Sequence, residues 1–179
     1  MKKLPLLLTI LVFAVSVPAH VFAQSNRVTV NFTFTKQSGF ASNQFAVWIE
    51  DAEGRYVKTI YAAKFTAGGG WQKRPLSLPE WVKKSNLARL NKTQIDALTG
   101  PTPKNGALSY VWDGTDSAGR AVAAGEYRVL VEATLRNENR VLYTAKIKLG
   151  EKGTVTAQPQ YFGSGTAERG MIGPVTVTY

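Results

Sequence analysis

The sequence of 179 residues contains no cysteine and only one histidine, His20, close to its start. Without cysteine it forms no disulfide, has no thiolate nucleophile and holds no soft metal site. A zinc site ordinarily uses His or Cys, and a serine triad needs a His base. These absences exclude the commonest routes to a metalloenzyme or a nucleophilic hydrolase. We therefore expect a protein that is not an enzyme and has no cofactor.

The first 23 residues are typical of a cleavable export signal. Two lysines precede an apolar stretch from Leu4 to Val17, and Ala23 provides a small residue at a cleavage point before Gln24. The apolar stretch is shorter than the roughly 20 residues that cross a bilayer, so we favour cleavage over an uncleaved anchor helix. Cleavage removes the histidine and leaves residues 24–179, a usual size for a single domain. We expect this domain in the periplasm, which permits disulfides without requiring them.

Positive charge is concentrated in the middle of the chain. The 22 basic residues less Lys2 and Lys3 leave twenty, against twelve acidic residues, so the exported part has a net charge of +8. The stretch Arg55–Lys104 contains ten basic residues and only two acidic ones, Glu80 and Asp96, and carries the whole surplus. A basic patch commonly indicates nucleic acid, but an exported protein rarely meets it. An acidic protein or another anionic surface of the envelope suits the compartment better.

Alternating apolar and polar residues predict strands along much of the chain. In the first, Arg27–Thr35, the valines and phenylalanines fall on one face and the threonines on the other. The other predicted strands are Phe45–Ile49, Arg55–Ala63, Leu108–Trp112, Glu126–Arg136, Arg140–Leu149 and Pro174–Tyr179. About seven strands with regular turns and no long helices predict an all-β, Ig-like β-sandwich.

The alternation stops between Phe65 and Pro103, which we interpret as a partly helical insertion carried on the sheet framework. Its three consecutive glycines, Gly68–Gly70, predict a flexible loop. Pro79 suits the start of a helix, so we predict a short helix from Glu80 to about Arg89. A capping box at Thr93–Asp96 predicts a second helical turn, which ends at Gly100.

Several motifs resemble those of known families. The stretch Trp112–Arg120, followed by Gly125–Tyr127, resembles the hairpin of the Ig-like domain in flagellar hook-capping proteins. Together with this hairpin, the segments Val47–Arg55, Asp96–Thr102 and Ile172–Tyr179 are similar, in the same order, to a family of predicted bacterial periplasmic proteins classed as a domain of unknown function. The resemblance implies a periplasmic Ig-like domain, often near membrane-bound flavin or metal-handling redox proteins. It implies no established catalytic residues.

The insertion is the main candidate for a partner-binding or ligand-binding surface. Tryptophans alternate with cations there, and rings together with cations suit an anionic or planar partner. The candidate residues are Trp71, Lys73, Arg74, Trp81, Lys83, Lys84 and Arg89. In the alternative interpretation, which is the commoner one, the tryptophans cover the sandwich and the lysine stems lie over them.

Asp113 and Asp116 lie in the hairpin and offer oxygen ligands to Ca²⁺. A calcium site uses six to eight oxygens, and this loop lacks the spacing of an EF-hand. Aspartates that cap a turn are commoner, and the neighbouring Gly114, Gly119 and Gly125 suit a structural turn.

A second group of carboxylates, Glu50, Asp51 and Glu53, crowds one predicted turn. A pair of carboxylates can hydrolyse glycosidic bonds without His. Acidic residues at an exposed turn are, however, usually only solvated.

The function that these observations favour is a non-catalytic periplasmic module that docks a protein partner. The family resemblance suggests that the partner belongs to a membrane redox or metal-uptake system. Two alternatives stay open, namely a carrier of a small anionic ligand or Ca²⁺, and a carboxylate-dependent hydrolase acting on envelope sugars. We expect no nucleic-acid partner.

Overall fold

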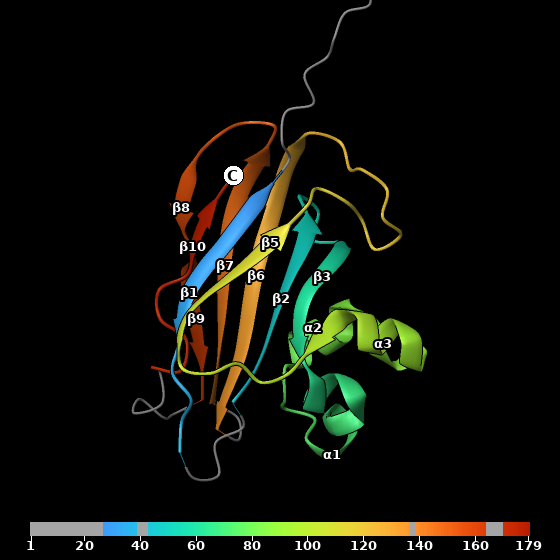
Figure 1. Cartoon of the computed structure of the whole chain (residues 1–179), viewed down its shortest axis with the longest axis vertical. Coiled ribbons are helices and arrows are strands. Elements are labelled where there is room, and N and C mark those ends of the chain that lie inside the picture. Colours follow the sequence, from blue (N-terminus) through green and yellow to red (C-terminus); the bar gives the residue numbers. More distant parts are fainter. Residues whose placement is uncertain (1–26, 39–42, 137–138, 164–169) are drawn as a thin grey trace, which may run out of the picture.

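The computed structural model describes residues 27–38, 43–136, 139–163 and 170–179. The expected export signal lies outside these residues. The described chain forms a four-stranded sheet in the order β5-β1-β10-β8 and a six-stranded sheet in the order β4-β3-β2-β6-β7-β9 (Figure 1). The strands are β1 (Val28–Phe34), β2 (Gln44–Asp51), β3 (Tyr56–Ala63), β4 (Thr99–Gly100), β5 (Gly106–Trp112), β6 (Gly125–Arg136), β7 (Asn139–Leu149), β8 (Thr154–Thr156), β9 (Gln158–Phe162) and β10 (Thr176–Thr178). The predicted all-β sandwich with a small helical insertion is confirmed.

The sandwich core forms where the alternating strands of the two sheets face each other. Val28, Val30 and Phe34 of β1 are fully buried, as the period-two pattern predicts. The Phe45 ring of β2 contacts the Phe34 ring of β1 across the core, with ring centroids 5.4 Å apart. Burial of such aromatic and branched side chains is the main force that holds the two layers together.

Three short strands were not predicted from the sequence. β8 and β9 follow each other closely, and the chain passes at Ala157 from the edge of one sheet to the edge of the other. β4 pairs in parallel with β3 through only two residues. Strands this short carry too little alternation for the pattern to reveal them.

The insertion between β3 and β5 is more helical than predicted. It contains a π-helical turn η1 (Thr66–Gly70), α1 (Trp71–Lys73), α2 (Pro79–Lys84), a 3-10 turn η2 (Leu87–Arg89) and α3 (Lys92–Leu98). Gly68–Gly70, predicted to form a flexible loop, lie in η1, which is kinked because Gly68 and Gly69 have non-helical φ and ψ angles. Glycine is needed here: Gly69 has φ 102°, and a Cβ on Gly70 would lie 2.3 Å from the Phe65 carbonyl oxygen.

The predicted bounds of the two helices also need correction. The helix predicted to reach Arg89 stops at Lys84, because Asn86 takes a left-handed conformation with φ 53° before η2 begins. The capping box of α3 is formed by Asn91 and Gln94, not by Thr93 and Asp96. Asn91 Oδ1 accepts the Gln94 N–H at 2.9 Å, and the Gln94 side chain accepts the Asn91 N–H at 2.9 Å.

Candidate functional site

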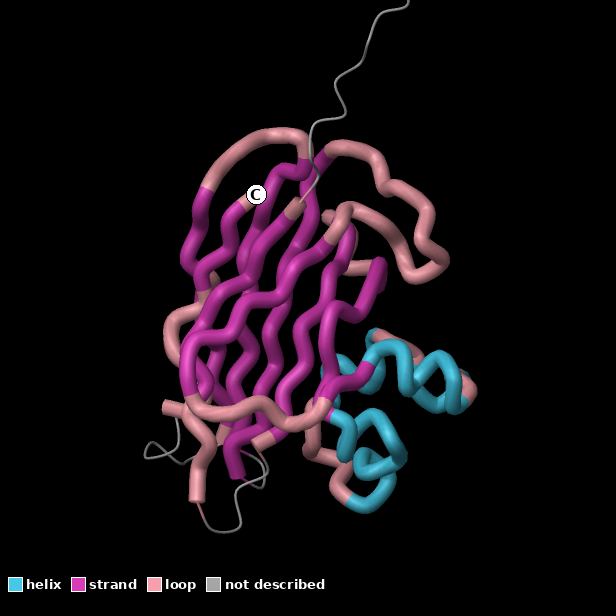
Figure 2. Tube along the Cα trace, in the orientation of Figure 1, coloured by secondary structure: helices cyan, strands magenta, loops and turns pink. Residues whose placement is uncertain are grey.

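The insertion packs against the outer face of the six-stranded sheet, and Figure 2 shows its helices gathered on one side of the strands. This is why β2 is buried along almost its whole length: Phe45, Val47 and Ile49 face the sandwich core, while Ala46 and Trp48 face the insertion. A second apolar core therefore lies outside the sandwich. Its buried members are Ala46, Trp48, Ala62, Ala67, Leu78, Trp81, Leu87 and Leu130.

Glu132, on the outer face of β6, holds the beginning of α2. It is fully buried, and its two oxygens accept the backbone N–H groups of Trp81 at 2.9 Å and Glu80 at 3.3 Å. Arg140 of β7 donates to the same carboxylate at 3.1 Å. Burial raises the pKa of Glu132 to about 7, although these N–H groups and Arg140 act in the opposite direction. The neighbouring Thr134 hydroxyl accepts the Leu78 N–H at 2.9 Å.

Glu50, on the outer face of β2, holds the other end of α2. Its carboxylate is buried, with 1% exposure, and lies 3.3 Å from Lys84 Nζ and 3.4 Å from Arg128 Nη1. Trp48 Nε1 also donates to it at 3.0 Å. Lys84 in addition donates to the Gly54 carbonyl, which joins α2 to the turn between β2 and β3. Two buried carboxylates thus fix the helix to the sheet at both ends.

This packing changes the set of candidate binding residues. Trp81 is fully buried and donates from Nε1 to Thr59 at 2.9 Å, so it is a core residue and not a contact residue of a surface site. Lys84 is engaged with Glu50 and the Gly54 carbonyl. The tryptophan therefore covers the sheet, as the alternative interpretation of the sequence holds.

The other five candidates lie on two parts of the insertion. Trp71, half-buried, and the exposed Lys73 and Arg74 belong to α1 and its C-terminal end. Lys83 and Arg89 are exposed on α2 and η2. Within the described part of the chain, Lys73, Lys83 and Arg89 form no ion pair. The insertion therefore presents surplus positive charge to its surroundings.

The candidate residues chosen from the sequence do not include two exposed apolar residues of the insertion. Phe65 is 44% exposed and Leu76 is 49% exposed, and they are two of the four large apolar side chains exposed in the described residues. The Arg74 guanidinium lies 5.1 Å from the centroid of the Phe65 ring. Neither residue belongs to a periodic pattern, so the sequence offers no signal that separates them from core residues.

The hairpin aspartates each have partners that belong to the turn. Asp113 accepts from Lys58 at 2.9 Å and from the Thr115 hydroxyl at 2.7 Å, and these bonds outweigh its partial burial and lower its pKa to about 2. Asp116 accepts the backbone N–H groups of Ala118 and Arg120 at 2.9 and 3.0 Å. No group of three or more metal-ligating residues occurs in the described ranges. The arrangement is that of turn caps and does not support the calcium site considered above.

The glycines of this hairpin have the conformations of a tight turn. Gly114, Gly119 and Gly125 have φ angles of 73°, 77° and 151°. These values lie in the region that favours glycine.

The carboxylates Glu50, Asp51 and Glu53 do not face a common substrate position. Glu50 is buried under α2, whereas Asp51 and Glu53 both pair with Arg55 at the surface, at 2.6 and 2.9 Å. A glycosidase needs two carboxylates on either side of the scissile bond. This turn does not provide that arrangement.

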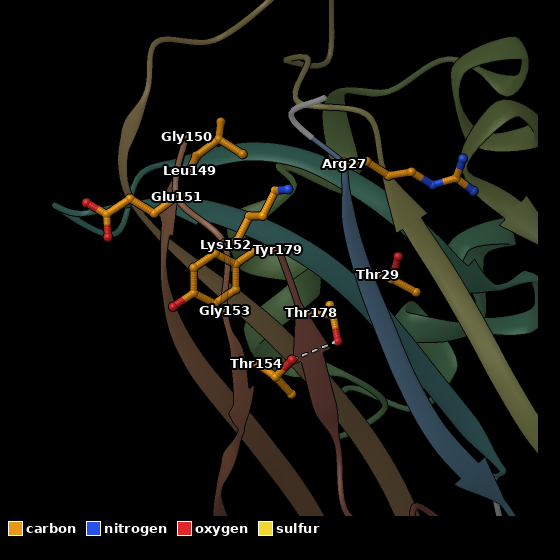
Figure 3. A pocket seen from close by; sticks show the side chains of 10 residues that line it. All are labelled: Arg27, Thr29, Leu149, Gly150, Glu151, Lys152, Gly153, Thr154, Thr178 and Tyr179. Carbon is orange, nitrogen blue, oxygen red and sulfur yellow. Dashed lines mark hydrogen bonds between the residues drawn. The ribbon is translucent and has the colours of Figure 1, made fainter. Parts of the chain in front are cut away.

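A cavity of about 760 Å³ lies at the end of the sandwich where β1 begins (Figure 3). It is lined by Arg27, Thr29, Leu149, Gly150, Glu151, Lys152, Gly153, Thr154, Thr178 and Tyr179. Its charged side chains do not converge, since Arg27 points away from Lys152 and Glu151 in Figure 3, and Glu151 pairs with Lys148 at 2.5 Å. The cavity has room for a small ligand but no assembled set of polar groups.

The helices of the described chain are all too short or too polar to cross a membrane. A family model described as "Predicted periplasmic protein (DUF2271)" matches residues 25–164. The chain therefore belongs to this family and is a periplasmic protein. No curated protein and no solved structure matches it.

Proposed function

We propose that this member of the periplasmic family is a non-catalytic module that docks an acidic protein partner through the exposed cations of its insertion. The observation that carries the proposal is the unbalanced charge of α2 and η2. Glu50 and Glu132 are used beneath the insertion to hold α2, whereas Lys83 and Arg89 above it have no anionic partner among the described residues. A fixed surface with unpaired cations suits an acidic partner.

The rigidity of the insertion supports docking rather than a purely solvated edge. Cations on a loosely held loop lose conformational entropy on binding, which weakens the complex. Here α2 is attached at both ends, and Trp81 anchors its middle in the outer core. Its cations therefore stand in a preformed arrangement.

The kind of partner follows only from the family resemblance. The resemblance noted in the sequence implies a protein near membrane-bound flavin or metal-handling redox proteins, and on that ground we propose that the partner belongs to a membrane redox or metal-uptake system. The likeness to hook-capping proteins is limited to the hairpin Trp112–Tyr127 and supports a fold element, with no flagellar role attached to it.

The test is affinity capture of tagged residues 24–179 from the detergent-solubilised envelope of the source cells, at low and high salt, read by mass spectrometry. We expect one membrane protein to be enriched at low salt and reduced at high salt. Its recovery should fall for Lys83→Gln/Arg89→Gln and persist for Lys36→Gln/Lys146→Gln, which removes two exposed cations elsewhere. Equal recovery with both double variants, or no enriched protein, would overturn the proposal.

Carriage of a small anion is a second candidate function. The end cavity favours it, because Arg27 and Lys152 line a volume of about 760 Å³ and form no ion pair among the described residues. A ligand at a hundred times its Kd stabilises a domain by about 2.7 kcal/mol. A panel of small carboxylates and phosphates should then include one that raises the melting temperature of the protein but not that of Lys152→Gln. A panel that shifts neither protein removes this candidate.

A further inference from the structure

We infer that the corner of the insertion formed by Phe65, Lys73, Arg74 and Leu76, hereafter the apolar corner, contacts the surface of a bilayer that contains anionic lipid. The corner includes neither Lys83 nor Arg89, so the inference does not depend on the proposed protein partner. The periplasm is bounded by membranes, so a family located there has such surfaces within reach.

The chain segments that carry the two apolar residues are held together by a buried hydrogen bond. The hydroxyls of Thr66 and Ser77, the residues that follow Phe65 and Leu76, are 2.8 Å apart and fully buried or nearly so. The Thr66 hydroxyl also donates to the Gln44 side chain at 3.1 Å. Phe65 and Leu76 thus project from neighbouring points of a backbone that is anchored to the sheet.

Fixed anchoring explains why these side chains stay exposed. The Thr134 hydroxyl donates to the Leu76 carbonyl at 3.3 Å and accepts the Leu78 N–H at 2.9 Å, so the chain on both sides of Ser77 is tied to β6. The corner cannot fold its apolar groups into the outer core without breaking these bonds. Exposed apolar side chains on a fixed backbone, with cations beside them, are consistent with a contact surface.

The charges around the corner favour lipid headgroups. Lys73 and Arg74 are exposed beside the two apolar residues, and the Arg74 guanidinium lies over the Phe65 ring at 5.1 Å. Residues 64–79 contain no Asp or Glu, so nothing in the segment repels an anionic surface. An apolar tip with adjoining cations matches a bilayer interface, where rings enter the boundary region and cations stay with the phosphates.

The small size of the apolar corner also favours a bilayer surface over a protein partner. A stable protein interface usually has an apolar centre surrounded by a rim, contributed by some 20 to 30 residues on each side. Here only two apolar side chains are exposed, one before and one after η1 and α1 in the sequence, and Figure 1 shows α1 at the outer edge of the insertion. Such a small group enters a soft interface more readily than it fills a pocket of matching shape.

The experiment is vesicle flotation of residues 24–179 with phosphatidylcholine vesicles and with vesicles of phosphatidylcholine and phosphatidylglycerol in equal amounts. We expect binding to the anionic vesicles that weakens with salt. Lys73→Gln/Arg74→Gln should lower the partition coefficient by about thirtyfold, at roughly fivefold for each charge near the surface. Phe65→Ser/Leu76→Ser should lower it by at least about tenfold. Val111→Ser, which removes another exposed apolar group, should leave it unchanged.

The outcomes separate this inference from the proposed function. Melting temperatures within a few degrees of the unaltered protein establish that the variants are folded. Equal binding to both kinds of vesicle, no binding, or equal effects of Phe65→Ser/Leu76→Ser and Val111→Ser would overturn the inference. Capture from detergent-solubilised envelope uses no bilayer, so it can succeed while flotation fails. If Phe65→Ser/Leu76→Ser abolishes that capture and flotation is absent, the corner contacts protein instead of lipid.

Discussion

The buried carboxylate of Glu132 makes the stability of the protein depend on pH in the range from pH 5 to pH 8, where side chains of ordinary pKa do not titrate in residues 24–179. Residues 24–179 contain neither His nor Cys, so no side chain of ordinary pKa titrates between pH 5 and pH 8. Burial raises the pKa of Glu132 from 4.5 to about 7 in the folded protein. Between these values the folded protein holds a proton that the unfolded chain has released. Stability from this group is therefore complete below pH 4.5 and is lost as the pH rises through 7.

The size of the effect follows from the two pKa values. Proton linkage with a folded pKa of about 7 and an unfolded value of 4.5 gives a loss of about 2 to 3 kcal/mol between pH 5 and pH 8. For a domain of this size, that corresponds to a melting temperature lower by about 5 to 10 °C. The variant Glu132→Gln keeps the shape of the side chain but cannot ionise, so its stability should lack this dependence.

The assay is urea unfolding of the protein and of Glu132→Gln at pH 5, 6, 7 and 8. The difference between their free energies of unfolding should change by about 2 to 3 kcal/mol across the series, in favour of the variant as the pH rises. This comparison cancels the titration of the terminal amino group. Glu126→Gln, an exposed residue of the same strand, should show no change with pH. A difference for Glu132→Gln that stays constant within about 0.5 kcal/mol would refute the reasoning, because it would mean that Glu132 is ionised throughout.

Three further predictions test the packing and the turns. Trp81→Ala should lower the free energy of unfolding by about 3 to 5 kcal/mol, because it leaves a cavity in the outer core and removes one hydrogen bond to the Thr59 hydroxyl; a loss below 1 kcal/mol in urea unfolding would contradict this. Asn91→Ala should cost about 1 kcal/mol through loss of the α3 cap, whereas Thr93→Ala should cost less, which the same measurement checks. Asp113, whose pKa is lowered to about 2, contributes stability that is present above its ordinary value of 3.8 and lost as the pH falls toward 2. Asp113→Asn should therefore reduce the change in melting temperature between pH 4 and pH 2. If the melting temperature of the variant changes with pH as much as that of the unaltered protein, this would argue against the Lys58 pair.

The sandwich was predictable because its strands contact the core through one face only. The alternation of β1 is visible in the sequence, and the same residues prove to be buried. β2 is different, because both of its faces are buried. Trp48 and Glu50 lie on the face opposite the sandwich core, as the period of two requires, but the insertion covers that face with a second core. The partners of Glu50 and Glu132 include Lys84 and the Trp81 N–H, more than 30 residues away from each. Contacts at that separation depend on how the insertion folds back, which no local pattern records.

The candidate site was harder to predict for the same reason. Trp81 and Lys83 are two residues apart on one short helix, yet the first is fully buried and the second exposed. The sequence identifies a segment rich in tryptophan and cations, but only the sheet decides which face of α2 is covered. Phe65 stays exposed because Thr66 is tied to Gln44 and Ser77, which are 22 and 11 residues away.

These contacts also show what positions α2. A helix of six residues is marginal in isolation, so its place on the sheet depends on tertiary contacts. Apolar packing around Trp81 supplies attraction but tolerates small rotations and shifts. Glu132 and Glu50 do not tolerate them, because each is buried and requires a donor at a particular point of the helix, the Trp81 N–H for one and Lys84 for the other. A rotation of α2 would leave Glu132 with Arg140 alone and Glu50 with Arg128 and Trp48. Each buried carboxylate would then lose a hydrogen-bond donor, at a cost of about 1 to 3 kcal/mol. The two carboxylates therefore contribute less to the attraction between α2 and the sheet than to fixing a single orientation of the helix. In that orientation Lys83 faces outward.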